Sequence, residues 1–212
     1  MQYFWLNKND NKKLIVFFNG WGMNETPVQD LLCENFDILI LSDYRDFNFD
    51  FSQFDFSPYN EKYLISWSMG VYVSNLFKKE FENFDKKIAI NGTSKMIDNN
   101  FGIPEKIYKI TIKLFNESSC EKFIKNMFKD EKINPQITIA KPLEELKKEL
   151  ISIQKLEIKE ELNFDLAIIS SDDKIVPTKN QTNFWENKAL IKQINCAHYP
   201  FDNFKSWSEI LC

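Results

Sequence analysis

Short apolar runs that recur along the chain constrain its fold more than any other feature. Several of these runs are almost continuous rather than alternating, which is typical of strands buried on both faces of a parallel sheet. The runs cover residues 3–6, 14–18, 38–41, 63–65, 88–90, 166–169 and 190–194. Helical patterns lie between many of them, at residues 27–35, 69–84, 178–187 and 200–211. The alternation predicts an α/β fold, a mostly parallel sheet with helices on both faces.

The segment between residues 90 and 166 departs from this alternation. It has no strong strand pattern, and helices are predicted over residues 104–115, 121–132 and 142–159, each with apolar residues on one face. Helices inserted between two late strands are placed where a cap over an active site is built. We therefore expect a single domain over residues 1–212 with a helical cap at about residues 98–162.

Composition and charge exclude several classes of protein. The net charge of −4 argues against a general nucleic-acid binder. No run of eighteen apolar residues predicts a transmembrane helix, and the first residues do not read as a signal peptide, so we expect a cytoplasmic protein without a membrane role. Four cysteines without a C-x-x-C pair and a single histidine make a metal site unlikely.

The stretch YLISWSMG at residues 63–70 indicates a catalytic serine. A predicted strand runs into a tight turn that carries Ser68, and a helical pattern follows. This is the layout of a nucleophile elbow, usually G-x-S-x-G. Ser66 replaces the first glycine, which is a small substitution, and Gly70 keeps the second.

A serine nucleophile needs a histidine base, and that histidine needs a carboxylate to orient it. The only histidine, His198, follows the last predicted strand, where this chain order places the base. Asp172 and Asp173 follow the preceding strand. We favour Asp173, because many hydrolases of this type show D-x-x-V-P in this loop. The alternatives are a solvated histidine and an ordinary surface turn.

Acyl transfer to a serine nucleophile also needs backbone N–H groups that bind the developing oxyanion. The segment NGWGM at residues 19–23, which we call the oxyanion loop, follows an early predicted strand and contains two glycines. We predict the N–H groups of Trp21 and Met69 as the oxyanion donors. Asn19 stands where many such enzymes have histidine, so this assignment depends on backbone geometry alone.

These residues resemble the α/β-hydrolase superfamily across nearly the whole chain. The segments FFNGWGM at 17–23, SDYRDF at 42–47, WSMGV at 67–71, NGT at 91–93, FGIP at 101–104, ESSCEKFIKNMF at 117–128 and AHYPF at 197–201 are similar to the BioG-type pimeloyl-acyl-carrier-protein methyl ester esterases. The WSMG and AH-x-PF segments are shared with BioH-type esterases.

The resemblance implies a serine esterase of biotin synthesis that releases methanol from pimeloyl-ACP methyl ester through an acyl-enzyme. It implies Ser68 as nucleophile, His198 as base and Asp173 as orienting acid, with no cofactor and no metal. It also implies an acyl carrier protein as partner. The alternatives are a general short-chain carboxylesterase, a thioesterase, or a hydrolase-like module that only binds a ligand.

Lysines at helical spacing in the cap segment are candidates for docking an acidic carrier protein. A complementary basic face would steer such a partner. These candidates are Lys106, Lys109, Lys113, Lys122, Lys125, Lys129 and Lys132. The competing explanation is a solvated helix face. Two further questions stay open from the sequence: whether Tyr44 and Arg45 line the site or anchor a loop, and whether Trp67 lines an acyl channel or packs in the core.

Overall fold

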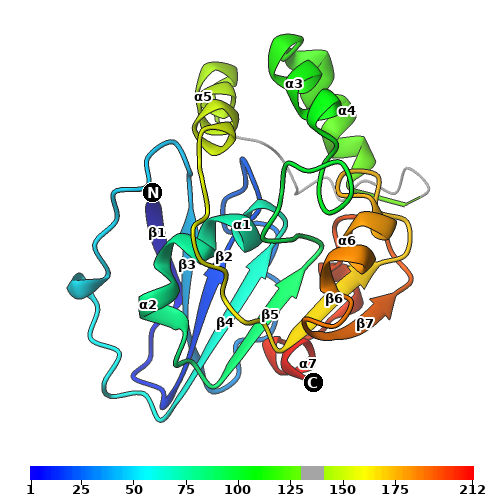
Figure 1. Cartoon of the computed structure of the whole chain (residues 1–212). Coiled ribbons are helices and arrows are strands. Elements are labelled where there is room, and N and C mark those ends of the chain that lie inside the picture. Colours follow the sequence, from blue (N-terminus) through cyan, green and yellow to red (C-terminus); the bar gives the residue numbers. More distant parts are fainter. Residues whose placement is uncertain (130–140) are drawn as a thin grey trace.

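The computed structural model describes residues 1–129 and 141–212, which form one seven-stranded sheet with helices around it (Figure 1). The strand order in the sheet is β1-β3-β2-β4-β5-β6-β7. The strands are β1 (Gln2–Asn7), β2 (Lys13–Phe18), β3 (Phe36–Ser42), β4 (Glu61–Trp67), β5 (Lys86–Ile90), β6 (Leu166–Ser170) and β7 (Leu190–Ile194). Strand β1 is antiparallel to β3, and every other pair is parallel. The predicted strands and the mostly parallel sheet are confirmed.

The sheet is buried on both faces, as the continuous apolar runs predicted. In β2, Leu14, Val16 and Phe18 belong to one hydrophobic cluster, whereas Ile15 and Phe17 belong to another, and all five are fully buried. Successive side chains of a strand point to opposite faces, so the two clusters are the two sides of the sheet. A near-continuous apolar run is therefore required here.

Each face of the sheet is covered by its own helices. The first cluster includes side chains from α1 (Met69–Ser74), α2 (Lys78–Phe81) and α6 (Thr178–Trp185). The second includes Trp207 and Ile210 of α7 (Trp207–Leu211). The layers of an α/β sandwich result.

Between β5 and β6, the described residues form three helices that stand above the sheet (Figure 1). They are α3 (Glu105–Lys113), α4 (Glu117–Asn126) and α5 (Leu143–Gln154). In Figure 1, α3 and α4 stand together and α5 stands apart from them, above the edge where the parallel strands end. Active sites of parallel α/β sheets lie at this edge, so the helices are placed to cover one.

The helix predicted over residues 27–35 is wrong, because the segment forms turns instead. Leu32 forms a bridge with Ser206: its N–H donates to the Lys205 carbonyl at 3.0 Å, and its carbonyl accepts from Trp207 N–H at 3.3 Å. Glu34 has a positive φ of 47°. Pairing with the C-terminal segment has taken the backbone groups that a helix would need.

The helix predicted over residues 69–84 is interrupted. Helix α1 ends at Ser74, a 3₁₀ turn covers Asn75–Phe77, and α2 follows. The Asn75 side chain donates to the carbonyls of Val71 and Tyr72 at 2.6 and 3.2 Å, and it accepts from Leu162 N–H at 2.7 Å. An asparagine that bonds to backbone groups competes with the helical pattern and breaks it here.

The remaining helix boundaries differ in smaller ways. Helix α4 begins at Glu117, four residues earlier than predicted, because Asn116 and Ser119 form a capping box. It ends at Asn126, and Lys132 lies outside the described residues. The helix predicted over 200–211 is a 3₁₀ turn at Phe201–Asn203 followed by α7.

Candidate active site

Ser68 occupies a strained turn between the end of β4 and the start of α1. Its φ of 55° and ψ of −120° lie outside the regions that non-glycine residues normally adopt. Such strain persists only where the surrounding structure enforces it. The side chain is 6% exposed, so its hydroxyl is held at the carboxyl edge of the sheet rather than in solvent.

Close backbone contacts enforce this turn and explain its glycines. A Cβ atom on Gly70 would lie 2.3 Å from the Phe18 carbonyl oxygen, at the end of β2. A Cβ atom on Gly92 would lie 2.3 Å from the Ser68 carbonyl oxygen. Strand and helix therefore approach so closely that no side chain fits at either position.

Ser66, which replaces the first glycine of the elbow motif, is fully buried in β4. Its hydroxyl has no hydrogen-bond partner among the described residues. The strand accommodates a small side chain at this position but offers nothing to its oxygen. The substitution is therefore compatible with the elbow, although it leaves a buried polar group unpaired.

His198 lies beside Ser68, with its Nε2 atom 2.8 Å from the serine Oγ. The histidine is only 1% exposed. Its backbone carbonyl accepts hydrogen bonds from Trp67 Nε1 at 3.1 Å and Asn91 Nδ2 at 2.9 Å. Trp67 is thus a core side chain that holds the backbone at His198, and it does not line the cavity described below.

Asp173 accepts a hydrogen bond from the other side of the imidazole, with Oδ2 2.8 Å from His198 Nδ1. The carboxylate is fully buried, and its Oδ1 accepts from the N–H groups of Ile175 and Val176, both at 2.9 Å. Gln181 Nε2 donates to Oδ2 at 2.8 Å. Four hydrogen bonds thus converge on Asp173, which compensates the burial of its charge.

The adjacent acid does not reach the histidine. The Asp172 side chain is 44% exposed and forms an ion pair with Lys174 at 3.8 Å. The choice of Asp173 over Asp172 from the sequence thus agrees with the observed geometry.

The oxyanion loop, residues 19–23, follows β2 and lies beside the elbow. Asn19 fixes its shape: the side-chain Oδ1 accepts from Gly20 N–H at 2.8 Å, and Nδ2 donates to the Asn24 carbonyl at 2.5 Å. Trp21 and Met69 line the same cavity as Ser68. The amide side chain of Asn19 therefore organises the loop.

A cavity of about 420 Å³ opens above Ser68. Its walls are mainly apolar and come from all three cap helices, including Ile107 of α3, Phe123 of α4 and Leu150 of α5. Small-molecule sites range from about 300 to 1,000 Å³. The cavity is therefore of a size and apolar character that suit a small ligand beside the serine.

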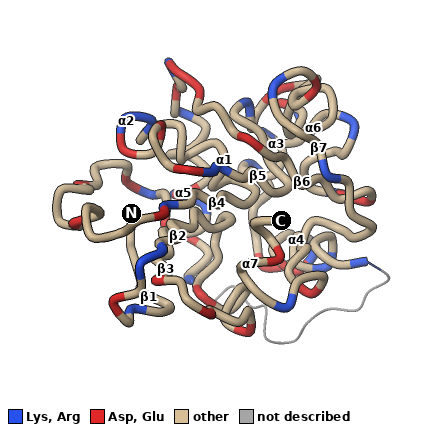
Figure 2. Tube along the Cα trace, turned by 90° about the horizontal axis from the view of Figure 1, so that it is seen from below, with Lys and Arg blue, Asp and Glu red and all other residues tan. Residues whose placement is uncertain are grey.

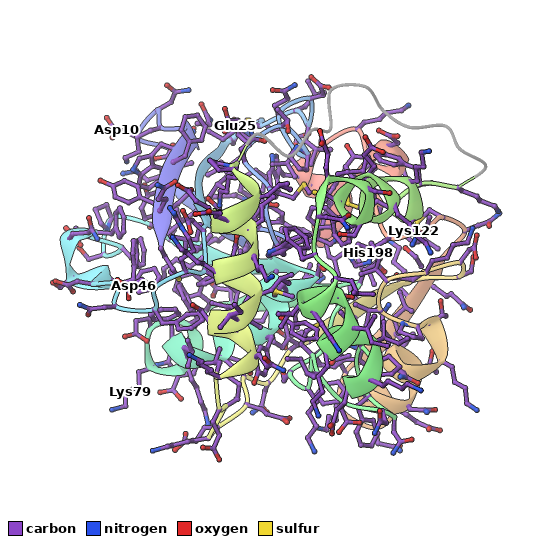
Figure 3. All side chains as sticks on the ribbon, turned by 90° about the horizontal axis from the view of Figure 1, so that it is seen from above. Asp10, Glu25, Asp46, Lys79, Lys122 and His198 are labelled. Atoms are coloured by element: carbon purple, nitrogen blue, oxygen red, sulfur yellow. The ribbon has the colours of Figure 1, made fainter. Side chains whose placement is uncertain are left out.

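The cap lysines fall into separate groups. Lys106, Lys109 and Lys113 line a shallow hollow on α3, and Lys109 forms an exposed ion pair with Glu105 at 3.0 Å. Lys122 of α4 instead lines the cavity above Ser68, together with Lys174. In Figure 3, which looks down on the cap, Lys122 and His198 lie on the same side of α5.

The two other candidate lysines, Lys125 and Lys129, belong to α4 and the turn after it. Lys129 Nζ donates to Asn195 Oδ1 at 2.9 Å, and Asn195 lies three residues before His198 in the chain. Acidic and basic residues are interspersed along the chain trace as a whole (Figure 2). The structure places the candidate lysines in three positions: on α3, at the cavity, and at the end of α4.

Other possible sites find less support in the described part of the chain. No group of three or more His, Cys, Asp or Glu side chains there could hold a metal ion. No helix there has the length and apolar character needed to cross a membrane. All four cysteines are free thiols, and the Cys196 Sγ atom lies 2.9 Å from Ser170 Oγ.

Sequence reasoning did not identify several residues that support the site. Asn91 follows β5 with a φ of 47°, and besides the His198 carbonyl it bonds Ser170 through both its amide atoms. Gln181 anchors Asp173 from α6. From the sequence, Asn91 could have been identified as a site residue because it directly follows a buried strand. Gln181 could not, because it lies inside an ordinary helical pattern.

A chain of hydrogen bonds from buried carboxylate to imidazole to hydroxyl is the arrangement that activates serine for acyl transfer. Comparison with known proteins identifies the family. The family model described as "Pimeloyl-ACP methyl esterase BioG" matches residues 1–210. BioG from Haemophilus influenzae, a crystal structure, is 32% identical, with a TM-score of 0.89 and 99% of each chain covered.

Two further relatives extend the comparison. An esterase from Exiguobacterium antarcticum is 14% identical, with a TM-score of 0.74 over 99% of this chain and 92% of its own, and shares the α/β-hydrolase fold. A Bacteroides fragilis protein named malonyl-[acyl-carrier protein] O-methyltransferase is 36% identical over 196 residues. That match covers 89% of this chain but only 40% of the relative's length.

Proposed function

The chain belongs to the BioG family of pimeloyl-ACP methyl esterases, and from this premise we propose that it hydrolyses the methyl ester of pimeloyl-acyl carrier protein. The observation that carries the proposal is the hydrogen-bonded chain from Asp173 through His198 to Ser68, at the base of an apolar cavity. The products are methanol and free pimeloyl-ACP, a step of biotin synthesis.

The proposed reaction proceeds through an acyl-enzyme. Ser68 Oγ attacks the ester carbonyl while His198 Nε2 accepts the hydroxyl proton. The N–H groups of Trp21 and Met69 bind the oxyanion of the tetrahedral intermediate. The C–O bond to the methoxy group then breaks, and the imidazolium donates its proton to the leaving methoxide, which departs as methanol. Water, activated by the same histidine, then releases the acid.

Asp173 makes the histidine effective in both half-reactions. Its Oδ2 accepts the hydrogen bond from Nδ1, so Nε2 is left free to face the serine. The carboxylate also stabilises the imidazolium when the serine proton has moved. Neither step needs a cofactor or a metal.

A carrier-linked substrate is supported by two observations. The relative from Bacteroides fragilis is named for methylating malonyl-acyl carrier protein, and a methyl ester on a carrier-bound acid is the kind of bond that this site would cleave. The cap also presents lysines on α3 and α4, and acyl carrier proteins are acidic. We propose that Lys106, Lys109 and Lys113 contribute to carrier docking, with Lys122, Lys125 and Lys129.

Kinetics on two substrates test this proposal. The combined variant with Lys106, Lys109 and Lys113 changed to Gln is compared with wild type on pimeloyl-ACP methyl ester and on p-nitrophenyl butyrate. We expect kcat/KM to fall about tenfold on the carrier substrate, because steering is lost, and to stay within about twofold on the small ester. A matched control neutralises Lys12, Lys79 and Lys205, which are exposed and outside the cap.

The outcomes separate the alternatives. Equal losses on both substrates, or equal losses in the control, would contradict docking at α3. Cleavage of the thioester instead of the methyl ester would indicate a thioesterase. Hydrolysis of the small ester without any action on the carrier substrate would indicate a general carboxylesterase.

A further inference from the structure

Glu149, on the inner face of cap helix α5, is a buried acid outside the catalytic chain. Its side chain is fully buried. Its Oε1 accepts a hydrogen bond from the Tyr44 N–H at 3.0 Å, and the Gly22 amide lies close enough to favour the charged carboxylate. Burying a carboxylate is costly unless its surroundings compensate it. The burial of this carboxylate therefore calls for a structural or functional explanation.

The oxyanion loop is linked to this carboxylate through Tyr44. At the Asn19 end, the Tyr44 hydroxyl donates to the Asn19 carbonyl at 2.7 Å, and the backbone of the same tyrosine is bonded to Glu149. Further along the loop, the Gly22 amide favours the charged form of Glu149 and so opposes the rise that burial causes in its pKa. Tyr44 is fully buried, so the hydrogen bonds that link Asn19 through Tyr44 to Glu149 are shielded from water.

The middle of the loop is held by the same helix. Trp21 Nε1 donates to the carbonyl of Leu146, which lies one turn before Glu149 on α5, at 3.1 Å. The Trp21 ring also packs edge-on against Phe123 of α4, with 4.9 Å between ring centroids. Every one of these anchors of residues 19–22 thus comes from the cap or from a side chain that the cap holds.

Charged neighbours surround Glu149 from several elements. Lys141 Nζ lies 3.7 Å from its Oε2 and 3.6 Å from Asp43 Oδ2. Arg45 binds Asp43 at 2.6 Å and Glu145 of α5 at 2.8 Å. From α3, Tyr108 approaches with its hydroxyl bonded to the Leu150 carbonyl at 3.1 Å. The acidic and basic side chains of this cluster nearly balance in charge. Their ion pairs join α5 to the loop after β3.

We propose that Glu149 is a positioning residue for the oxyanion hole: from the cap, and through Tyr44, it holds the Asn19 end of the oxyanion loop and thereby helps to set the direction of the Trp21 N–H. This inference rests on the proposed hydrolytic function of Ser68. An oxyanion donor works only when it is preorganised toward the developing charge, and loss of one donor costs about 10²- to 10³-fold in kcat. A donor that is misdirected rather than lost costs less.

The carboxylate form is the one that fits this role, since both backbone partners are donors. Burial raises the pKa of Glu149, and Asp43 adds to this, whereas Lys141 and the amides of Tyr44 and Gly22 oppose it. As the pH falls, the acid becomes neutral and binds its N–H partners less well. The contribution of Glu149 to kcat should therefore be larger at neutral than at acidic pH.

Steady-state kinetics of Glu149→Gln on p-nitrophenyl butyrate test the proposal, because this ester does not require a carrier protein. We expect kcat to fall about tenfold with KM within about twofold, since the amide keeps one acceptor but presents N–H groups to Gly22 and Lys141. The ratio of wild-type to variant kcat should shrink as the pH is lowered. Glu144→Gln, an exposed acid on the same helix, is the matched control and should match wild type.

A second variant keeps the test decisive if Glu149→Gln does not fold. Tyr44→Phe leaves the Tyr44 backbone on Glu149 but removes the hydroxyl that binds Asn19, so kcat should again fall several-fold at unchanged KM. Unchanged kcat in a folded Glu149→Gln or in Tyr44→Phe, or a loss that is equal at every pH, would overturn the inference. Failure of wild type to hydrolyse the ester would overturn the proposed function itself, before any variant is compared.

Discussion

Asp173 Oδ2 lies 2.8 Å from His198 Nδ1. The carboxylate is completely buried at the turn after β6, where two backbone amides and a glutamine fix its orientation. Asp172, its immediate neighbour, is turned to solvent and pairs with Lys174. Two adjacent aspartates in one loop therefore have separate environments, and only one of them can orient the imidazole.

This difference predicts opposite results for two matched substitutions. Asp173→Asn should lower kcat by about 10³- to 10⁴-fold, because an amide can hold the imidazole in the wrong tautomer and cannot stabilise its charged form. Asp172→Asn should change kcat less than about twofold. Hydrolysis of a nitrophenyl ester measures both. Equal effects of the two substitutions would contradict the assignment of the acid.

The close contacts at the elbow predict that replacing glycine by alanine destabilises the protein more at Gly70 than at Gly20. Gly70→Ala would place its Cβ atom 2.3 Å from the Phe18 carbonyl oxygen, a backbone atom that cannot move away cheaply. We expect this change to lower the free energy of unfolding by about 3 kcal/mol. Gly20→Ala meets only the Trp67 ring at 3.0 Å and should cost about 1 kcal/mol or less. Urea unfolding checks the order, and an equal cost at both glycines would contradict the close-contact account.

Ser66→Ala is expected to stabilise the protein by about 1 kcal/mol, because it removes a buried hydroxyl that lacks a partner among the described residues. The control is Ser74→Ala, at a buried serine whose hydroxyl donates to the Val71 carbonyl at 3.1 Å. That change should destabilise by about 1 kcal/mol. Chemical denaturation of both variants gives the two signs, and destabilisation by Ser66→Ala would show that its hydroxyl is satisfied.

Asp37 at the start of β3 gives a prediction for acid stability. Its buried carboxylate accepts from Lys8 Nζ, Tyr59 Oη and the Asn9 amide at 2.8–2.9 Å. Burial alone would raise the pKa of Asp37, but hydrogen bonds from Asn9, Lys8 and Tyr59 outweigh it and lower the pKa from 3.8 to about 2. The folded state therefore prefers the charged form.

The resulting stabilisation is present in full above the unfolded pKa of 3.8 and is lost as the pH falls through about 2. Asp37→Asn should lower the free energy of unfolding by about 2 kcal/mol at pH 5, and this cost should shrink to about 1 kcal/mol by pH 2.5. Urea titrations at both pH values measure the difference. Asp10→Asn, at an exposed acid 3.4 Å from Lys8, is the control. A cost independent of pH would contradict the role of the charge.

The sheet and the proximity of Ser68, Asp173 and His198 could be predicted from the sequence, because each depends on a local pattern. Continuous apolar runs such as residues 14–18 are required in strands buried on both faces, and the structure has them there. Ser68, Asp173 and His198 each follow a predicted strand, so the carboxyl edge of a parallel sheet brings them together. The order of chain elements was sufficient to infer their proximity.

What could not be predicted depends on contacts between distant segments. Residues 27–35 have a helical pattern, but pairing of Leu32 with the C-terminal segment makes turns more favourable. The role of Tyr44 in anchoring Asn19 depends on a buried acid 105 residues later in the chain, on a helix of the cap. Neither contact leaves a periodic signal in the sequence.

The proposed esterase activity is tested by mass spectrometry of intact pimeloyl-ACP methyl ester, incubated with wild type and with Ser68→Ala. We expect wild type alone to convert the ester to the acid, with loss of the mass of one CH₂ group and the acyl chain still on its carrier. Conversion by Ser68→Ala at the wild-type rate would contradict the assignment of the nucleophile. No conversion by folded wild type would contradict the proposed substrate.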